Sequence, residues 1–191
     1  MQWKDEGYLL YKNNYDENSI IIDAFTSEHG KHSGIVYGGS SRKLKKIFQI
    51  GNKILLNWKS KNENRTGYFS VELIDPISPF YFDDKKRSVC ILASTSILKI
   101  LLPERQNNKK IYNSFEKMLS TLNSKDWINV YIHWELSLIK DLGFGYDLKK
   151  DNEDNIKKAL IFNRKLLMEN FIIPNRLKFP FYRNMLENYF V

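Results

Sequence analysis

The sequence predicts an α+β protein in which a small five-stranded barrel or sandwich precedes an all-helical part. The first 75 residues carry the alternating, β-branched pattern of short strands, whereas apolar residues after Asp75 recur at helical spacing. The chain has 191 residues, which is the length of one large or two small globular units. Pro76 and Pro79 interrupt the pattern between the halves, so we place domains at residues 1–77 and 78–191.

Short runs of apolar, β-branched or aromatic residues predict five strands, over residues 7–12, 19–26, 34–37, 54–59 and 68–74. The clearest is the fourth, where Ile54, Leu56 and Trp58 share one face and polar residues lie between them. We therefore expect Trp58 to be a core residue. No helix of any length fits between these strands, which favours a small barrel or sandwich.

Helical spacing predicts five helices in the second half. The first follows Asp83–Asp84, the second contains Tyr112–Leu122, and the third begins at a Ser124 cap. The last two cover about 153–170 and 175–189. Pro103 ends the first helix, which is apolar on most sides and is expected to be central and buried. Cys90 lies inside this helix and is expected to be a small core residue.

Several classes of protein are excluded by composition. The longest apolar run, Val89–Ala93, is too short to cross a bilayer, and the N-terminus lacks the apolar region of a secretory signal. A single cysteine rules out a disulfide framework and any Cys₄ or Cys₂His₂ zinc site. We expect a cytoplasmic protein without a metal or other cofactor and without a membrane partner.

Catalytic motifs are weak or missing. Gly30-Lys31-His32 resembles the end of a phosphate-binding loop, but the hydroxyl residue and the first glycine of that motif are absent. We expect His29 and His32 to be solvated residues of a turn, and His133 to pack within a helix. No nucleophile has a base at a meaningful spacing, so the sequence predicts that the protein is not an enzyme.

The positive charge is concentrated in one segment. The chain has a formal charge of +8, and the 29–62 segment alone holds eight Lys and Arg residues with no Asp or Glu. Glycines and serines precede four cations in the connection between the third and fourth strands, a composition suited to following a phosphate backbone. The predicted DNA-binding residues are Lys31, Arg42, Lys43, Lys45, Lys46, Lys59 and Arg65, with Lys61 extending the stripe. Candidate base-stacking residues are Trp3 and Tyr37, with Tyr68 and Trp58 as further aromatic residues. The alternative is that the loop charges only solvate the surface.

The order and spacing of several motifs resemble the RecO family of bacterial DNA-repair proteins. The motifs are Trp3-x-Asp5-Glu6-Gly7-Tyr8-x-Leu10, Phe25-Thr26-x-Glu28-His29-Gly30, Val36-x-Gly38-Gly39-x-Ser41-Arg42, Leu101-Leu102-Pro103-Glu104-Arg105 and Trp134-Glu135-Leu136 with Leu142-Gly143-Phe144-Gly145. The match runs over most of residues 1–147. Many relatives carry a zinc-binding insertion with four cysteines after the last motif, and this chain resembles a short form without it.

The resemblance implies an N-terminal OB-fold that binds single- and double-stranded DNA, followed by a helical domain. It implies a recombination mediator that anneals complementary strands and, with RecR and the single-stranded DNA-binding protein, assists the loading of RecA in the nucleoid. In relatives the helical domain receives the acidic tail of the single-stranded DNA-binding protein, which points to His133 here. Two alternatives stay open: a protein–protein adaptor whose basic loop docks an acidic tail, and an RNA-binding OB-fold.

Overall fold

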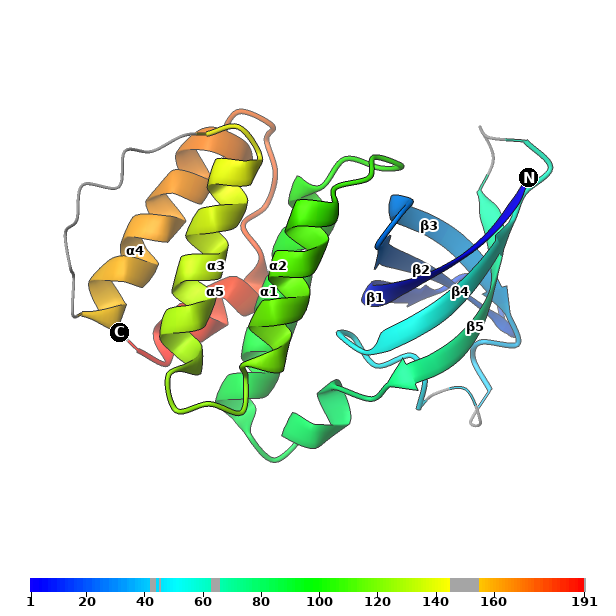
Figure 1. Ribbon diagram of the computed structural model, residues 1–191, viewed down its shortest axis with the longest axis horizontal. Coiled ribbons are helices and arrows are strands. Elements are labelled where there is room, and N and C mark those ends of the chain that lie inside the picture. Colours follow the sequence, from blue (N-terminus) through cyan, green and yellow to red (C-terminus); the bar gives the residue numbers. More distant parts are fainter. Residues whose placement is uncertain (42–43, 45, 63–65, 145–154, 191) are drawn as a thin grey trace.

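The computed structural model describes residues 1–41, 44, 46–62, 66–144 and 155–190. A β-barrel stands on one side and the helices on the other (Figure 1). The strands are β1 (Gln2–Asn14), β2 (Ser19–Thr26), β3 (Gly30–Tyr37), β4 (Lys53–Lys59) and β5 (Gly67–Asp75). The helices are η1 (Ser78–Tyr81), α1 (Lys85–Leu101), α2 (Lys109–Ser120), α3 (Trp127–Asp141), α4 (Ile156–Leu167), η2 (Met168–Ile172) and α5 (Phe181–Asn188). The predicted α+β class, five strands followed by helices, is confirmed.

The five strands close into a barrel in the order β1-β2-β3-β5-β4, with β4 pairing back to β1. Neighbouring strands are antiparallel except β3 and β5, which are parallel. This is the five-stranded mixed barrel of the OB-fold, and the β3–β5 pairing that closes it is short, joining Gly34 to Gly67 and Ile35 to Tyr68.

Inward and outward residues alternate along the barrel strands as the sequence predicts. Trp58 is 4% exposed and lies in the barrel core with Ile54 and Leu56, so its assignment to the core is confirmed. The backbones of the parallel strands β3 and β5 approach the aromatic rings of the barrel core closely at two glycines. A Cβ atom on Gly67 would lie 2.1 Å from Nε1 of Trp58, and one on Gly34 would lie 2.4 Å from the Phe69 ring, so neither position has room for a side chain.

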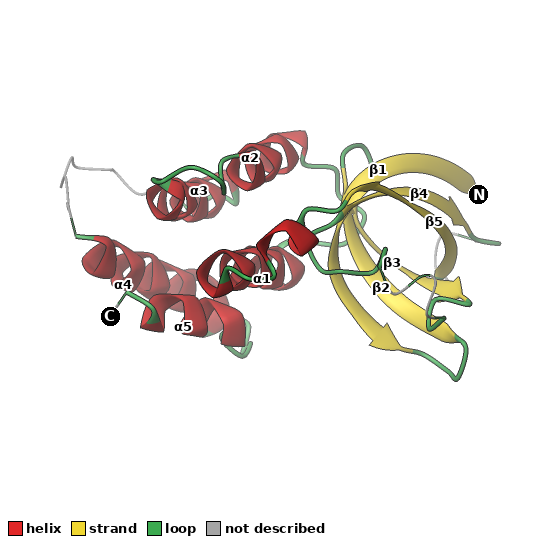
Figure 2. Ribbon diagram, turned by 90° about the horizontal axis from the view of Figure 1, so that it is seen from below, coloured by secondary structure: helices red, strands yellow, loops and turns green. Residues whose placement is uncertain are grey.

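One end of the barrel is closed by α1 and α2, which lie next to it in both views (Figures 1 and 2). Tyr8 and Phe25 leave the barrel core and join the apolar core of the helices, where both rings contact Tyr112 of α2. The Tyr8 hydroxyl donates to Oε1 of Glu116 at 3.0 Å, and the Lys53 ammonium donates to the same atom at 2.7 Å. The barrel and helices therefore share a continuous interface.

The helix starts agree only in part with the prediction. Asp84 caps α1 as expected, because its carboxylate accepts from the backbone N–H of Arg87. The prediction that Ser124 caps the third helix is wrong, since the N-cap residue of α3 is Asp126. The last helix begins at Phe181 rather than near residue 175, because Pro180 occupies its N-cap and disfavours helical geometry in the preceding residue.

The centre of the helical part holds a buried ion pair. Arg183 of α5 is fully buried, and its guanidinium donates to both carboxylate oxygens of Glu135 in α3 at 2.6 and 3.0 Å. Cys90 is also fully buried there, which confirms its prediction as a core residue. Among the described residues, none of the helices combines the length and apolar character needed to cross a bilayer.

Candidate nucleic-acid interface

The outer surface of β1, β4 and β5 carries ordered rows of polar residues. The strand registers place Gln2 beside Lys59, and Lys59 beside Tyr68. The next outward row consists of Lys4, Asn57 and Ser70. These side chains point outward because their chain neighbours, among them Trp58 and Phe69, point into the barrel.

The charge of this surface changes along the barrel. Lys4 and Lys59 are exposed, and neither forms an ion pair within the described part of the chain. The third row is acidic, with Glu6 and Glu72 on either side of Leu55. The cationic rows lie at the end of the barrel that is farthest from the helices, where the N-terminus and the β4–β5 connection meet (Figures 1 and 2). We call this end, with Gln2, Lys4, Lys59, Lys61 and Tyr68, the distal face.

Two tyrosines form an exposed pair beside these rows. Tyr37 ends β3 and Tyr68 is the second residue of β5, and their rings stack with centroids 5.1 Å apart and planes 19° apart. Tyr37 is 64% exposed and Tyr68 is 43% exposed. The pKa of Tyr37 is raised above its usual value, chiefly by the neighbouring Tyr68 side chain.

Trp3, the other candidate for base stacking, is differently placed. Its ring stacks on His29 at a centroid distance of 4.2 Å and on Trp58 at 5.5 Å, with both planes nearly parallel to it. Rings therefore pack against Trp3 on two sides, and its side chain is half-buried. We leave Trp3 out of the interface and assign it to the packing of the barrel.

The prediction of solvated turn histidines is wrong for His32, which is buried, whereas His29 lies in a turn with its side chain 34% exposed. His29 lies 2.9 Å from the carboxylate of Asp5, which also accepts from the Ser27 hydroxyl at 2.7 Å. The pKa of Asp5 is lowered, because these hydrogen bonds outweigh the effect of its burial. His32 is 7% exposed, and its burial, together with the charge of Arg105, lowers its pKa to about 4.

Lys31 lies on β3 but not on the distal face. It is buried, and its ammonium donates to the backbone carbonyl of Lys99 in α1 at 2.7 Å. Burial lowers its pKa, although the carboxylates of Glu104 and Asp23 oppose this effect. A lysine held in this way ties the barrel to α1, so we remove Lys31 from the expected DNA-binding stripe.

The remaining predicted cations are only partly described. Arg42, Lys43, Lys45 and Arg65 lie outside the described residues. Lys46 is exposed in the connection between β3 and β4, while Leu44 of the same connection packs against the barrel core. The apolar contact anchors this basic connection to the barrel.

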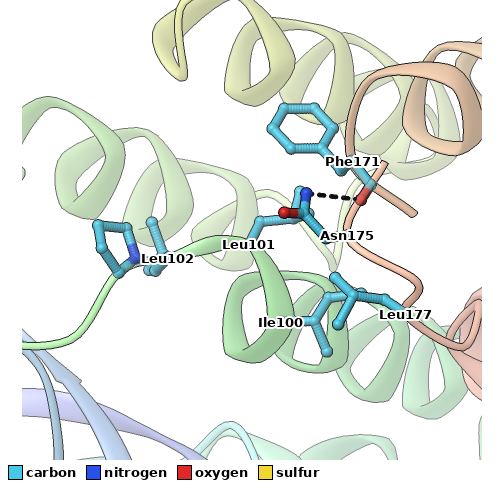
Figure 3. A pocket seen from close by; sticks show the side chains of 7 residues that line it. Ile100, Leu101, Leu102, Phe171, Asn175 and Leu177 are labelled. Carbon is cyan, nitrogen blue, oxygen red and sulfur yellow. Dashed lines mark hydrogen bonds between the residues drawn. The ribbon is translucent and has the colours of Figure 1, made fainter. Parts of the chain in front are cut away.

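The helical part offers two further features. His133 is exposed on α3, not packed as expected, and its Nδ1 lies 2.7 Å from the carbonyl oxygen of Asn129. A hollow of about 310 Å³ lies where the end of α1 meets η2 and the following turn (Figure 3). Its lining is mostly apolar and comes from Ile100, Leu101, Leu102, Pro103, Phe171, Asn175 and Leu177.

A zinc site of the four-cysteine type does not fit this chain. Cys90 is the single cysteine, and it is fully buried in α1 among apolar side chains. Burial raises the pKa of its thiol well above the usual range, which opposes the thiolate form that zinc requires. In the residues that the structure describes, no group of three potential ligands comes together.

Sequence reasoning missed Lys4 because the first strand was expected to begin at Gly7. The strand begins at Gln2, and the charged Asp5 on its inner face hides the alternation that would reveal it. Once Trp3 and Asp5 are known to point inward, strand parity alone places Lys4 on the outer surface.

Comparison with known proteins agrees with this architecture. The family described as "Recombination protein O N terminal" matches residues 1–77, and "Recombination protein O C terminal" matches residues 83–157. The DNA repair protein RecO of Cereibacter sphaeroides is 35% identical over 162 residues, which cover 85% of this chain and 67% of the relative. RecO of Roseobacter denitrificans is 34% identical over 78% of this chain and 62% of its own length, and RecO of a Wolbachia strain from Drosophila simulans is 32% identical over 85% and 68%. The chain, a short form without the cysteines of a zinc site, belongs to the RecO family of DNA repair proteins, which are non-enzymatic recombination mediators.

Proposed function

We propose that the protein binds single- and double-stranded DNA, anneals complementary strands and assists RecA loading in recombinational repair, in the cytoplasm at the nucleoid. The observation that carries this proposal is the distal face of an OB-fold barrel, where exposed lysines gather and one of them, Lys59, is in register with Tyr68 of the exposed tyrosine pair. OB-folds bind oligonucleotides on the barrel surface near the connection between strands 4 and 5, which is where Lys59 and Lys61 lie.

Annealing on such a surface needs no bond to be made or broken. Two DNA strands repel each other through their phosphates, and this repulsion is the main electrostatic barrier to their pairing. Lysines that neutralise phosphates release condensed counterions and lower that barrier, while base pairing itself supplies the specificity. Lys4, Lys59 and Lys61 supply cations to the distal face, and the basic connection with Arg42, Lys43, Lys45 and Lys46 is proposed to extend it.

The partners are proposed from the family: RecR, the tail of the single-stranded DNA-binding protein, and RecA indirectly. His133 is the residue at which we place the tail. It is exposed on α3, which lies on the side of the molecule away from the barrel (Figure 1). DNA on the distal face and a peptide on α3 would therefore not compete for the same surface.

The first experiment measures the binding of fluorescent single-stranded DNA by anisotropy across a salt series. The test variant changes Lys4, Lys59 and Lys61 to Ala, and the control changes the exposed helix-side residues Lys117, Lys125 and Lys140 to Ala, so both lose the same charge. At about 0.7 per phosphate contact, the test variant loses roughly 2 from the slope of log K against log salt. An unchanged slope would refute the distal face as the DNA site.

A second variant tests the basic connection. Changing Arg42, Lys43, Lys45 and Lys46 to Ala should lower the same slope by roughly 3. If the native protein binds DNA weakly and an acidic peptide well, the adaptor function replaces the one proposed here. A marked preference for an RNA oligonucleotide of the same sequence would instead indicate recognition of 2′-hydroxyl groups.

A further inference from the structure

We propose that the Tyr37–Tyr68 pair is a stacking platform for unpaired bases, which makes the distal face bind single strands in preference to duplex. The proposal rests on the DNA-binding function above and adds the form of DNA that this site selects. It is carried by the juxtaposition of two exposed, mutually stacked rings with an exposed lysine in register beside one of them.

The pair has no evident role in the barrel core. Val36 and Phe69, the neighbours of the two tyrosines in sequence, point inward and are 4% exposed. Tyr37 and Tyr68 are more than ten times as exposed, although aromatic rings on a soluble protein usually bury most of their surface. Two such exposed rings in a near-parallel stack form a preorganised surface rather than a packing contact.

The neighbouring strands place a cation at the right separation for a nucleotide. Lys59 is the direct cross-strand partner of Tyr68, so the two side chains leave the barrel about 5 Å apart at Cβ. A base stacked on the platform then brings its own phosphate within reach of the flexible lysine. Lys61, two residues further along, is exposed and extends the phosphate path into the β4–β5 connection.

The platform distinguishes unpaired bases from bases in a duplex. An unpaired base has a free face and gains about tenfold or more in affinity by stacking on an aromatic side chain. A base in a duplex is already stacked on both sides, and it would have to leave the helix to use the tyrosines. Duplex is therefore bound through its phosphates alone.

This difference has a consequence for annealing. Single strands are held by stacking and by charge, but once two strands pair, their bases leave the platform and only the phosphate contacts remain. The product is then bound more weakly than the reactants, so that it dissociates instead of blocking the site. The structure thus gives the distal face a way to turn over without any source of chemical energy.

The test compares single- and double-stranded 20-mers of one sequence by anisotropy at fixed salt. The variant Tyr37→Leu/Tyr68→Leu removes the planar rings, and Tyr182→Leu on α5, an exposed tyrosine away from the barrel, is the control. We expect single-strand affinity to fall about tenfold or more, duplex affinity to change less than about twofold, and the salt slope to stay unchanged. The variant Tyr37→Phe/Tyr68→Phe keeps the rings and should retain native single-strand binding.

A single strand that lacks bases supplies an independent measurement. Native protein should bind this abasic oligonucleotide no better than the leucine variant binds normal single strand. Equal losses for single strand and duplex, or no loss for either, would overturn the platform while the lysine variants still test the DNA-binding function. Absence of DNA binding by the native protein would overturn both proposals.

Discussion

Acidification should destabilise the barrel through His32. This imidazole is buried on β3, edge-on to Trp3 and to Trp58 at centroid distances of 5.0 and 5.8 Å, and its Nδ1 has no hydrogen-bond partner among the described residues. Burial, with the charge of Arg105, lowers its pKa from 6.5 to about 4. Between these values the unfolded chain binds a proton that the folded protein does not, so stability falls as the pH falls.

The size of the effect follows from the two pKa values. At pH 5 the pH is about 1.5 units below the pKa of the imidazole in the unfolded chain, which is therefore protonated. The imidazole of folded His32 is still mostly neutral at this pH. Each unit corresponds to about 1.4 kcal/mol, so His32 alone lowers the free energy of unfolding by about 2 kcal/mol between pH 7.5 and pH 5. Below pH 4 both forms are protonated and the loss levels off.

Urea unfolding followed by circular dichroism at pH 7.5 and pH 5 measures this loss. His32→Phe keeps an aromatic ring and removes the titrating group, so the difference between native and variant isolates His32 from other groups that titrate in this range. His32→Gln, which is smaller and polar, is a second variant in case the Phe ring is too large. If native protein and both variants lose the same free energy of unfolding between the two pH values, the assignment of the acid sensitivity to His32 is refuted.

Three further substitutions test the packing, each by urea unfolding at pH 7.5. Asp84→Ala removes the N-cap of α1 and should cost about 1 kcal/mol, whereas Asp84→Asn should retain most of the stability. Gly67→Ala places a methyl group against the Trp58 ring and should cost about 1–3 kcal/mol; a neutral result would mean that the ring is free to move. Arg183→Met leaves Glu135 buried without its ion pair and should cost about 3–5 kcal/mol, most of which Glu135→Leu in the same chain should restore if the cost is that of an unpaired charge.

The strands were the most predictable elements because their signals are local. The second strand was expected over residues 19–26 and β2 has those bounds, and the alternation of Ile54, Leu56 and Trp58 predicted which face is buried. The first strand was expected to be much shorter. Its N-terminal half includes Asp5, whose burial is compensated by hydrogen bonds from the Ser27–His29 turn, and sequence alone does not reveal such a distant partner.

The predictions of the Ser124 cap and of a solvated His32 failed for a related reason. Ser124 has the chemistry of a cap, yet α3 begins two residues after the expected position, at Trp127, and the carbonyl of Ser124 accepts instead from the Arg87 side chain of α1. His32 follows a glycine turn and reads as solvated, but β3 extends back to Gly30 and carries it into the barrel. In both cases a tertiary contact overrides the local preference.

The basic segment shows why charge counting finds a binding region but not its residues. Lys31 and Lys53 belong to the same run as Lys59, yet Lys31 donates to a carbonyl of α1 and Lys53 pairs with Glu116 of α2. These two lysines lie where the barrel meets the helices, and they hold the two parts together.

Lys59 lies at the other end of β4, six residues from Lys53 and about 20 Å along the strand at its usual rise. The same strand therefore carries a structural cation at one end and an exposed cation at the other. This division separates the two proposed activities in space: DNA on the distal face is a barrel's length from the helices, whose outer surfaces stay free for protein partners. Weakening DNA binding at Lys59 should accordingly leave partner binding by the helical part unchanged, whereas removing Lys53 should loosen the junction between the two.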